Sequence, residues 1–169
     1  MNTLKKLLAL GFLTCIVNIA TAQTYNTGIG IRLGGQSSGI TFRHFTNGDG
    51  AIEGIVSLGH KSFIVTGLYE KFKPINNAPG LQWFYGGGLH IGFFSYGGHY
   101  NRYKDHGHYY YVEEEGGTAV VPGVDFIIGL DYKFDNAPIN IGLDLKPFID
   151  FDNGLRGYWD GAFSFRFVF

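Results

Sequence analysis

The sequence predicts an all-β protein: an eight-stranded antiparallel up-and-down transmembrane β-barrel. Three observations lead to this prediction. Along most of the chain, apolar residues alternate with polar residues or glycine, and no long stretch repeats apolar residues at helical spacing. Aromatic residues make up 17% of the chain and glycine supplies 27 of its 169 residues, which is unusual for a soluble protein of this size. The N-terminus has the order of a secretory signal peptide.

Residues 1–22 are expected to be this signal peptide and to be cleaved, which leaves 23–169 as the barrel domain. The segment contains, in order, a basic start, an apolar run and an A-x-A cleavage site, at Lys5 and Lys6, 7–17 and 20–22. A membrane anchor is the alternative, but the run is shorter than the ~20 residues that a spanning helix needs. The only cysteine, Cys15, lies in this segment, so no disulfide framework is expected in the mature chain.

The charge of the mature chain gives no sign of a nucleic-acid partner. Without Lys5 and Lys6, the 13 basic residues become 11, against 14 acidic residues. No basic stripe runs along any segment, which excludes the usual electrostatic footprint of a DNA- or RNA-binding domain.

Eight segments carry a period-two pattern, and each is predicted to be one strand. In chain order they span residues 25–33, 39–45, 51–58, 63–72, 81–94, 124–134, 139–151 and 159–169. The first three are shorter or are interrupted by residues such as Gly54, and turn residues separate the first four. The sequence NGDG at 47–50 is a strong hairpin signal, and Pro74 and Pro79 mark a turn after the fourth strand.

The last four segments show the alternation most clearly. In 139–151, Ile141 and Leu143 share one face, while Asp144 lies on the other. The chain ends in AFSFRFVF, where every second residue is phenylalanine, so one face of the last strand is wholly aromatic.

An apolar face opposite a charged face decides between two kinds of barrel. A soluble ligand-binding barrel is apolar inside, whereas an apolar exterior around a polar interior is typical of a transmembrane barrel. Closure also removes the strand edges, which a bilayer cannot hydrogen-bond. A soluble β-sandwich is the alternative, since its sheets also have one apolar and one polar face. Against it, six aromatic residues fall near one end of the barrel, as in an interfacial girdle: Trp83, Tyr85, Tyr132, Phe134, Phe167 and Phe169.

If both termini are periplasmic, the connections divide between the two sides of the membrane. The periplasmic turns are then 46–50, 73–80 and 135–138. The external connections are 34–38, 59–62, 95–123 and 152–158, of which only 95–123 is long.

The segments GLYEKF, LQWFYGGGLHIGFF and IIGLDYKF resemble the small eight-stranded outer-membrane barrels, the superfamily of outer-membrane proteins A, X and W. Their glycine-rich, aromatic style is similar to uncharacterised members from Bacteroidota. The resemblance implies an outer-membrane location, contact with outer-membrane lipid and a monomer. It also implies that Phe165, Phe167 and Phe169 form the C-terminal signal that the barrel-assembly machinery recognises.

The inner face is expected to carry a network of charges. An eight-stranded barrel is just wide enough for side chains to fill, so charges inside it must pair. They either form a structural ion-pair network or line a narrow polar path. The residues are Arg32, Arg43, Glu53, Glu70, Asp125, Asp131, Lys133, Asp144, Lys146 and Arg166.

The long connection at 95–123 is the candidate site for an extracellular ligand, because tyrosine with glycine and serine is typical of adaptable recognition loops. Alternatively, it only extends the two flanking strands as a hairpin. Its candidate residues are His99, Tyr100, Tyr103, His106, His108, Tyr109, Tyr110 and Tyr111. His106 and His108 are weak candidates for zinc or copper, since nothing fixes the remaining ligands, and no cofactor is expected.

His60 and Ser62 belong to an H-x-S tripeptide, which resembles the serine–histidine arrangement of some outer-membrane lipid deacylases. A serine nucleophile needs a histidine that an acid orients, and the nearby Glu53 and Glu70 face inward by the alternation. No catalytic residue and no enzyme activity are therefore expected. The sequence favours a structural or surface-interaction role, with a narrow pore for small solutes as the alternative and a lipid-modifying enzyme as a remote one.

Overall fold

The computed structural model describes residues 26–35, 38–46, 48–59, 62–96, 100–105, 108–113, 116–152 and 154–169. For 96, 100–105 and 108–113, it describes the backbone only. The expected signal peptide, 1–22, lies outside the described residues.

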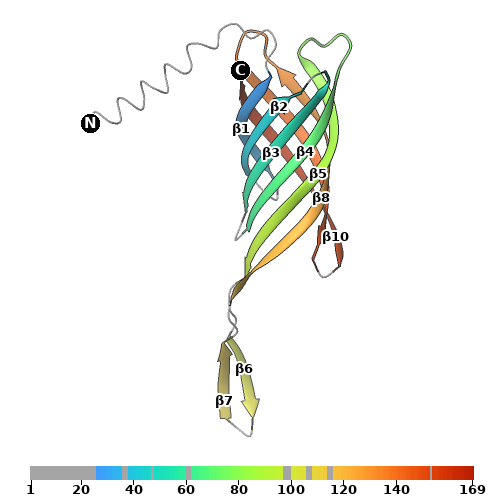
Figure 1. Cartoon of the computed structure of the whole chain (residues 1–169). Coiled ribbons are helices and arrows are strands. Elements are labelled where there is room, and N and C mark those ends of the chain that lie inside the picture. The colour runs from blue at the N-terminus through green and yellow to red at the C-terminus, as the bar shows by residue number, and fades with distance from the viewer. Residues whose placement is uncertain are drawn as a thin grey trace, which may run out of the picture.

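Eight strands close into one antiparallel barrel, which confirms the prediction of an all-β, eight-stranded up-and-down barrel (Figure 1). Around the barrel their order is β1-β10-β9-β8-β5-β4-β3-β2. The strands are β1 (Thr27–Gly34), β2 (Ser38–Phe45), β3 (Gly50–Gly59), β4 (Ser62–Pro74), β5 (Leu81–Tyr96), β8 (Gly117–Lys133), β9 (Ile139–Phe151) and β10 (Leu155–Val168). In the described part of the chain, no helix has the length and hydropathy of a membrane span.

The two ends of the chain close the barrel. Strands β1 and β10 pair along their length, with Ile31 opposite Phe165. Beyond the last pair of the ladder, the backbone N–H of Phe169 donates to the carbonyl of Thr27 at 2.9 Å, and the N–H of Thr27 donates to Phe169 at 3.0 Å. The end of the barrel at which these residues lie is called the terminal end. The opposite end, where β1 ends at Gly34 and β5 ends at Tyr96, is called the hairpin end.

The predicted connection at 95–123 is too long, because the flanking strands continue into it. The β5–β8 ladder runs without a break to the pair Tyr96 and Gly117. Between these strands, β6 (Tyr100–Asp105) and β7 (His108–Glu113) form a two-stranded sheet of their own beyond the hairpin end (Figure 1). The last strand also begins earlier than predicted, at Leu155 instead of Trp159, because β10 continues its pairing with β9 to Phe151.

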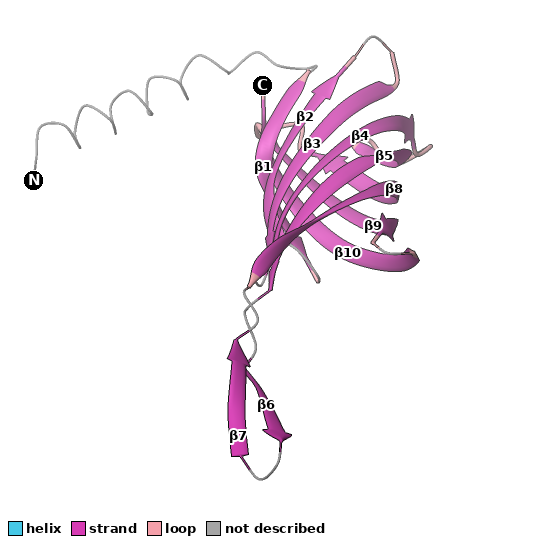
Figure 2. Ribbon diagram, turned by 60° about the horizontal axis from the view of Figure 1, so that its bottom comes forward, coloured by secondary structure: helices cyan, strands magenta, loops and turns pink. Residues whose placement is uncertain are grey.

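Burial follows the predicted alternation, with apolar side chains outside and charged side chains inside. Outward residues such as Leu89 and Leu143 are 66% and 59% exposed, whereas the inward Arg32 and Glu53 are each 1% exposed. The seam between β1 and β10 has the same arrangement on both strands. The barrel therefore has an apolar outer wall and a polar lumen. Figure 2 shows how its strands curve into a tube.

Candidate functional site: the polar lumen

Arg43 on β2 is the centre of the largest ion-pair cluster in the lumen. Its guanidinium lies 2.5 Å from Glu53, 3.0 Å from Glu70 and 2.8 Å from Asp131. Asp131 is on β8, which is four strands away from β2 in either direction around the barrel. The Arg43–Asp131 pair therefore crosses the lumen and closes it at this level.

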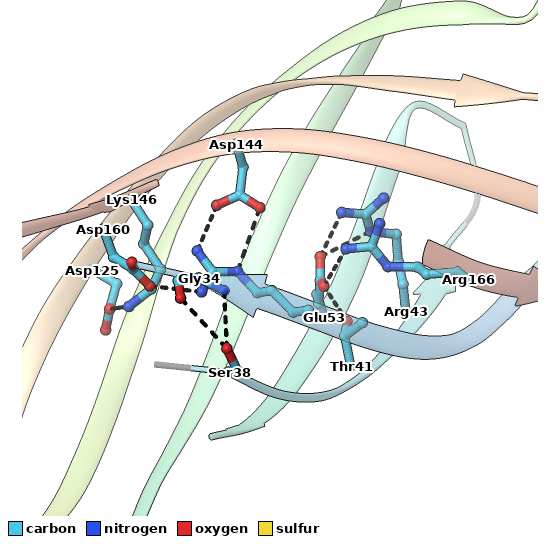
Figure 3. Close-up of polar contacts among 11 residues, drawn as sticks. Gly34, Ser38, Thr41, Arg43, Glu53, Asp125, Asp144, Lys146, Asp160 and Arg166 are labelled. Atoms are coloured by element: carbon cyan, nitrogen blue, oxygen red, sulfur yellow. Dashed lines mark hydrogen bonds and ion pairs between the residues drawn. The ribbon is translucent and has the colours of Figure 1, made fainter. Parts of the chain in front are cut away.

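Arg166 on β10 completes this cluster from the third side. It lies 2.7 Å from Glu53 and 3.7 Å from Asp131, and Figure 3 shows both guanidinium groups directed at Glu53. The Thr41 hydroxyl donates a further hydrogen bond to Glu53. The carboxylate of Glu53 is thus held by two cations and one hydroxyl, as a buried charge requires.

Aromatic rings seal the lumen between this cluster and the terminal end. The Phe72 ring stacks on Phe84 at 5.0 Å and contacts Phe45 at 4.8 Å. The Arg43 guanidinium lies 4.9 Å and 5.0 Å from the ring centres of Phe72 and Phe84, within the range of a cation–π contact. These rings join a buried apolar cluster that also contains Leu68. The lumen is filled with apolar side chains at this end.

A second ion-pair cluster lies on the other side of the Arg43 cluster, toward the hairpin end. Arg32 on β1 donates two hydrogen bonds to Asp144 on β9, at 2.6 and 3.4 Å, and one to Asp160 on β10 at 2.9 Å. The two bonds to Asp144 use the fork geometry that makes an arginine–carboxylate pair strong and specific. They are drawn as the paired dashed lines at Asp144 in Figure 3.

A third cluster, around His90 on β5, lies nearest the hairpin end. The Nδ1 atom of His90 is 2.7 Å from Asp125, and its Nε2 atom is 3.0 Å from Asp150. Lys146 donates to the other oxygen of Asp125 at 2.5 Å. Because a neutral imidazole has a single N–H, both histidine bonds form only if His90 is charged or one carboxyl keeps its proton.

The position of the His90 ring depends on a glycine, which has no side chain, at residue 123. Gly123 on β8 lies beneath the imidazole, and a Cβ atom there would be 2.2 Å from Cε1 of His90. The glycine lets the ring cross β8 and reach Asp150 on β9. The edge of the His90 ring also meets Phe148 at 5.6 Å.

A cavity of about 270 Å³ lies beside the His90 cluster, at the hairpin end of the lumen. Residues of β3, β4, β5, β9 and β10 line it: Ser57, Ser62, Ile64, Thr66, His90, Phe94, Lys146, Phe148, Asp150 and Tyr158. The lumen is thus packed shut in its middle and at the terminal end, and hollow toward the hairpin end.

Acids outnumber bases in the lumen. The buried carboxyl groups of the described residues are Glu53, Glu70, Asp125, Asp131, Asp144, Asp150 and Asp160, and the buried cationic groups are Arg32, Arg43, Lys146, Arg166 and, when protonated, His90. Glu70 accepts no hydrogen bond within the described part of the chain, although it lies in ion-pair range of Arg43. The excess of acid makes every cation of the lumen important for its stability.

The structure brings together nine of the ten charged residues that the sequence places inside. The tenth, Lys133, is half-buried near the terminal end of β8. His90, Asp150 and Asp160 also lie at inward positions of their strands, but no sequence signal marks them as members of a cluster.

The other predicted site residues lie apart from the lumen or outside the description. Phe165 and Phe169 point outward on or next to β10, and Phe167 lies 6.4 Å from Phe169, ring centre to ring centre. Ser62 lines the cavity, while His60 is outside the described residues. His99 and His106 are also outside them; the backbones of Tyr100 and Tyr103 lie on β6, and those of His108, Tyr109, Tyr110 and Tyr111 lie on β7.

A small exposed ion pair lies at the terminal end, between the β2–β3 turn and the end of β4. Lys73 donates to Asp49 at 2.6 Å, and this hydrogen bond lowers the pKa of the Asp49 carboxyl. The described residues include no group of three or more His, Cys, Asp or Glu side chains arranged to hold a metal ion.

Comparison with protein-family models finds no match for this chain, and comparison with curated proteins finds none either. The function must be inferred from the residues themselves.

Proposed function

We propose that the chain is an outer-membrane β-barrel with a structural or surface-interaction role. One observation carries the proposal: apolar side chains cover the outside of the barrel, and charged side chains fill the inside. In water, so continuous an apolar exterior would be far larger than the patches that soluble monomers expose. A bilayer supplies the apolar surroundings that this surface needs.

The aromatic residues at the terminal end support the same proposal. Trp83 stacks on Tyr85 at 5.3 Å, and Tyr132 meets Phe134 edge-on at 4.8 Å, all on the outer wall. Such aromatics form the girdles of membrane barrels at the level of the lipid head groups. The terminal end is then periplasmic, the hairpin end extracellular, and Phe169 is available to the assembly machinery during biogenesis.

Closure also favours a monomer that does not conduct ions. Each barrel strand has two neighbours within the same chain, so no strand edge needs a second subunit. Arg43 and Asp131 bridge opposite walls, and the rings of Phe72 and Phe84 fill the lumen between this pair and the terminal end. A pore for small solutes would require both layers to move aside.

Two measurements test the proposal. The mature chain should fold in detergent or lipid vesicles, migrate differently on electrophoresis before and after heating, and fractionate with the outer membrane. A folded, monodisperse chain in water without detergent would contradict the membrane assignment. In planar bilayers the folded protein should show no steady conductance, and a steady conductance would favour the pore.

A further inference from the structure

The cavity beside His90 has the features of a ligand site rather than of a packing fault. Residues of five strands line it, and polar residues lie on opposite sides of it, on β3 and β4 and on β9. We propose that this cavity binds a neutral, polyhydroxylated ligand: one sugar unit, either free or at the end of a longer glycan. The inference rests on the proposed function in one respect: if the hairpin end is extracellular, the ligand enters the cavity from outside the cell.

Charge balance favours a neutral ligand. Lys146 is held by Asp125 at 2.5 Å, and His90 lies between Asp125 and Asp150. When His90 is protonated, two cations face two carboxylates, and the wall has no net charge. A charged ligand would leave one of these groups facing a like charge, which is costly at a desolvated site.

Unused hydrogen-bonding groups favour a ligand with several hydroxyls. Ser57, Ser62 and Thr66 bring three hydroxyl groups to one side of the cavity, and none of them makes a side-chain hydrogen bond within the described ranges. On the opposite side, Asp150 uses only Oδ1 for His90, which leaves Oδ2 able to accept. Hydroxyls donate and accept, and so does each hydroxyl of a sugar.

Aromatic rings supply the apolar part of the site. Phe148 stacks on Tyr158 at 5.5 Å, and Phe94 lines the cavity from β5. A sugar ring presents C–H groups on its faces and hydroxyls around its edge, so it matches a pocket of ring faces and a few polar groups. The volume of about 270 Å³ is just below the ~300–1,000 Å³ of pockets for drug-sized ligands, which suits a single unit.

The site is held in place before any ligand arrives. Asp125 and Lys146 fix each other, and Gly123 gives the His90 ring the space it occupies. The Lys146 ammonium also lies 4.6 Å from the centre of the Phe148 ring. A preorganised wall lowers the entropy cost of binding.

Saturation-transfer NMR on the folded barrel in lipid nanodiscs tests the inference. The neutral probes are D-glucose, D-galactose, D-mannose and N-acetyl-D-glucosamine, and the charged probes are D-glucosamine and D-glucuronate. We expect saturable binding of at least one neutral sugar, and binding of the charged probes weaker by about tenfold or more. Binding of no neutral sugar, or tighter binding of a charged one, overturns the proposal. A trisaccharide that ends in the bound sugar then separates the two sources: tighter binding indicates a glycan end, and equal or weaker binding indicates the free sugar.

Variants locate the binding. Ser57→Ala and Thr66→Val each remove one cavity hydroxyl and should weaken binding by about 2- to 10-fold. Ser164→Ala is the matched control, since it removes a buried hydroxyl of β10 that does not line the cavity, and it should change nothing. Equal affinity in all three variants overturns the proposal. Heat-modifiable migration is scored on the same samples, so a chain that folds in lipid but binds no sugar contradicts this inference and leaves the proposed function standing.

Discussion

Replacing Arg43 with methionine is expected to destabilise the barrel more than any other single loss of charge. The guanidinium contacts three carboxylates, those of Glu53, Glu70 and Asp131. Methionine keeps much of the apolar volume against the neighbouring phenylalanine rings but supplies no charge. The lumen already holds more acids than bases, so the remaining bases cannot compensate all of the buried negative charge that is left.

The expected loss follows from this arrangement. Removing one partner of a buried ion pair costs about 3–5 kcal/mol, because the remaining charge is left uncompensated. Arg166 still faces Glu53 at 2.7 Å, so the loss should fall within this range and not at three times it.

Denaturant unfolding in detergent micelles, followed by tryptophan fluorescence, measures this effect. Arg156→Met is the matched control: Arg156 is exposed on β10, and surface substitutions usually change the free energy of unfolding by less than about 0.5 kcal/mol. If both variants unfold at the same denaturant concentration, the inward placement of Arg43 and its pairing are wrong.

Three further changes have expected results. Gly123→Ala should lower the free energy of unfolding by about 1–3 kcal/mol, because the new Cβ would lie 2.2 Å from the His90 ring. Gly67→Ala is the control, since a Cβ there meets nothing within 4 Å. Equal unfolding midpoints for the two variants would show that the clash does not occur. Deleting Phe169 should reduce folded protein in the outer membrane of cells more than refolding yield in detergent, whereas a matched loss would make it only a packing residue. Asp49→Asn should slightly lower the melting temperature at neutral pH but not in strong acid. The pKa of Asp49 is lowered in the folded protein, so its carboxylate stabilises the fold above the ordinary pKa of about 3.9, and this stabilisation is lost as the pH falls through the lowered pKa. An equal effect at both pH values would contradict this.

The barrel could be predicted from the sequence because its signal is local. The period-two contrast, as between Phe165 and Arg166, assigns a face to each residue without any knowledge of its partners. At 95–123 this contrast is lost, because tyrosine and glycine lie among the charges. The extension of β5 and β8 there depends on pairing between residues such as Phe93 and Val120, which the pattern of one strand does not show.

The pairing of the lumen could not be predicted for a related reason. Which carboxylate meets which cation depends on the stagger of strands around the barrel, and stagger is set by closure. Arg43 and Asp131 are separated by 88 residues in the chain and meet across the lumen. His90 reaches Asp150 only because Gly123 leaves the wall between them bare, and a glycine in a strand has several other meanings.

Lipid contact around the whole outer wall tests the central claim most directly. The only cysteine of the sequence is in the predicted signal peptide, so single cysteines can be placed at outward positions of the mature chain and spin-labelled. Suitable positions on four strands are Ile31, Val65, Ile128 and Leu143, which are 49%, 43%, 52% and 59% exposed. In lipid vesicles, all four labels should collide with dissolved oxygen, which concentrates in the bilayer, and be shielded from a water-soluble nickel chelate. Labels that the chelate reaches on any of these strands would contradict a barrel that spans the membrane.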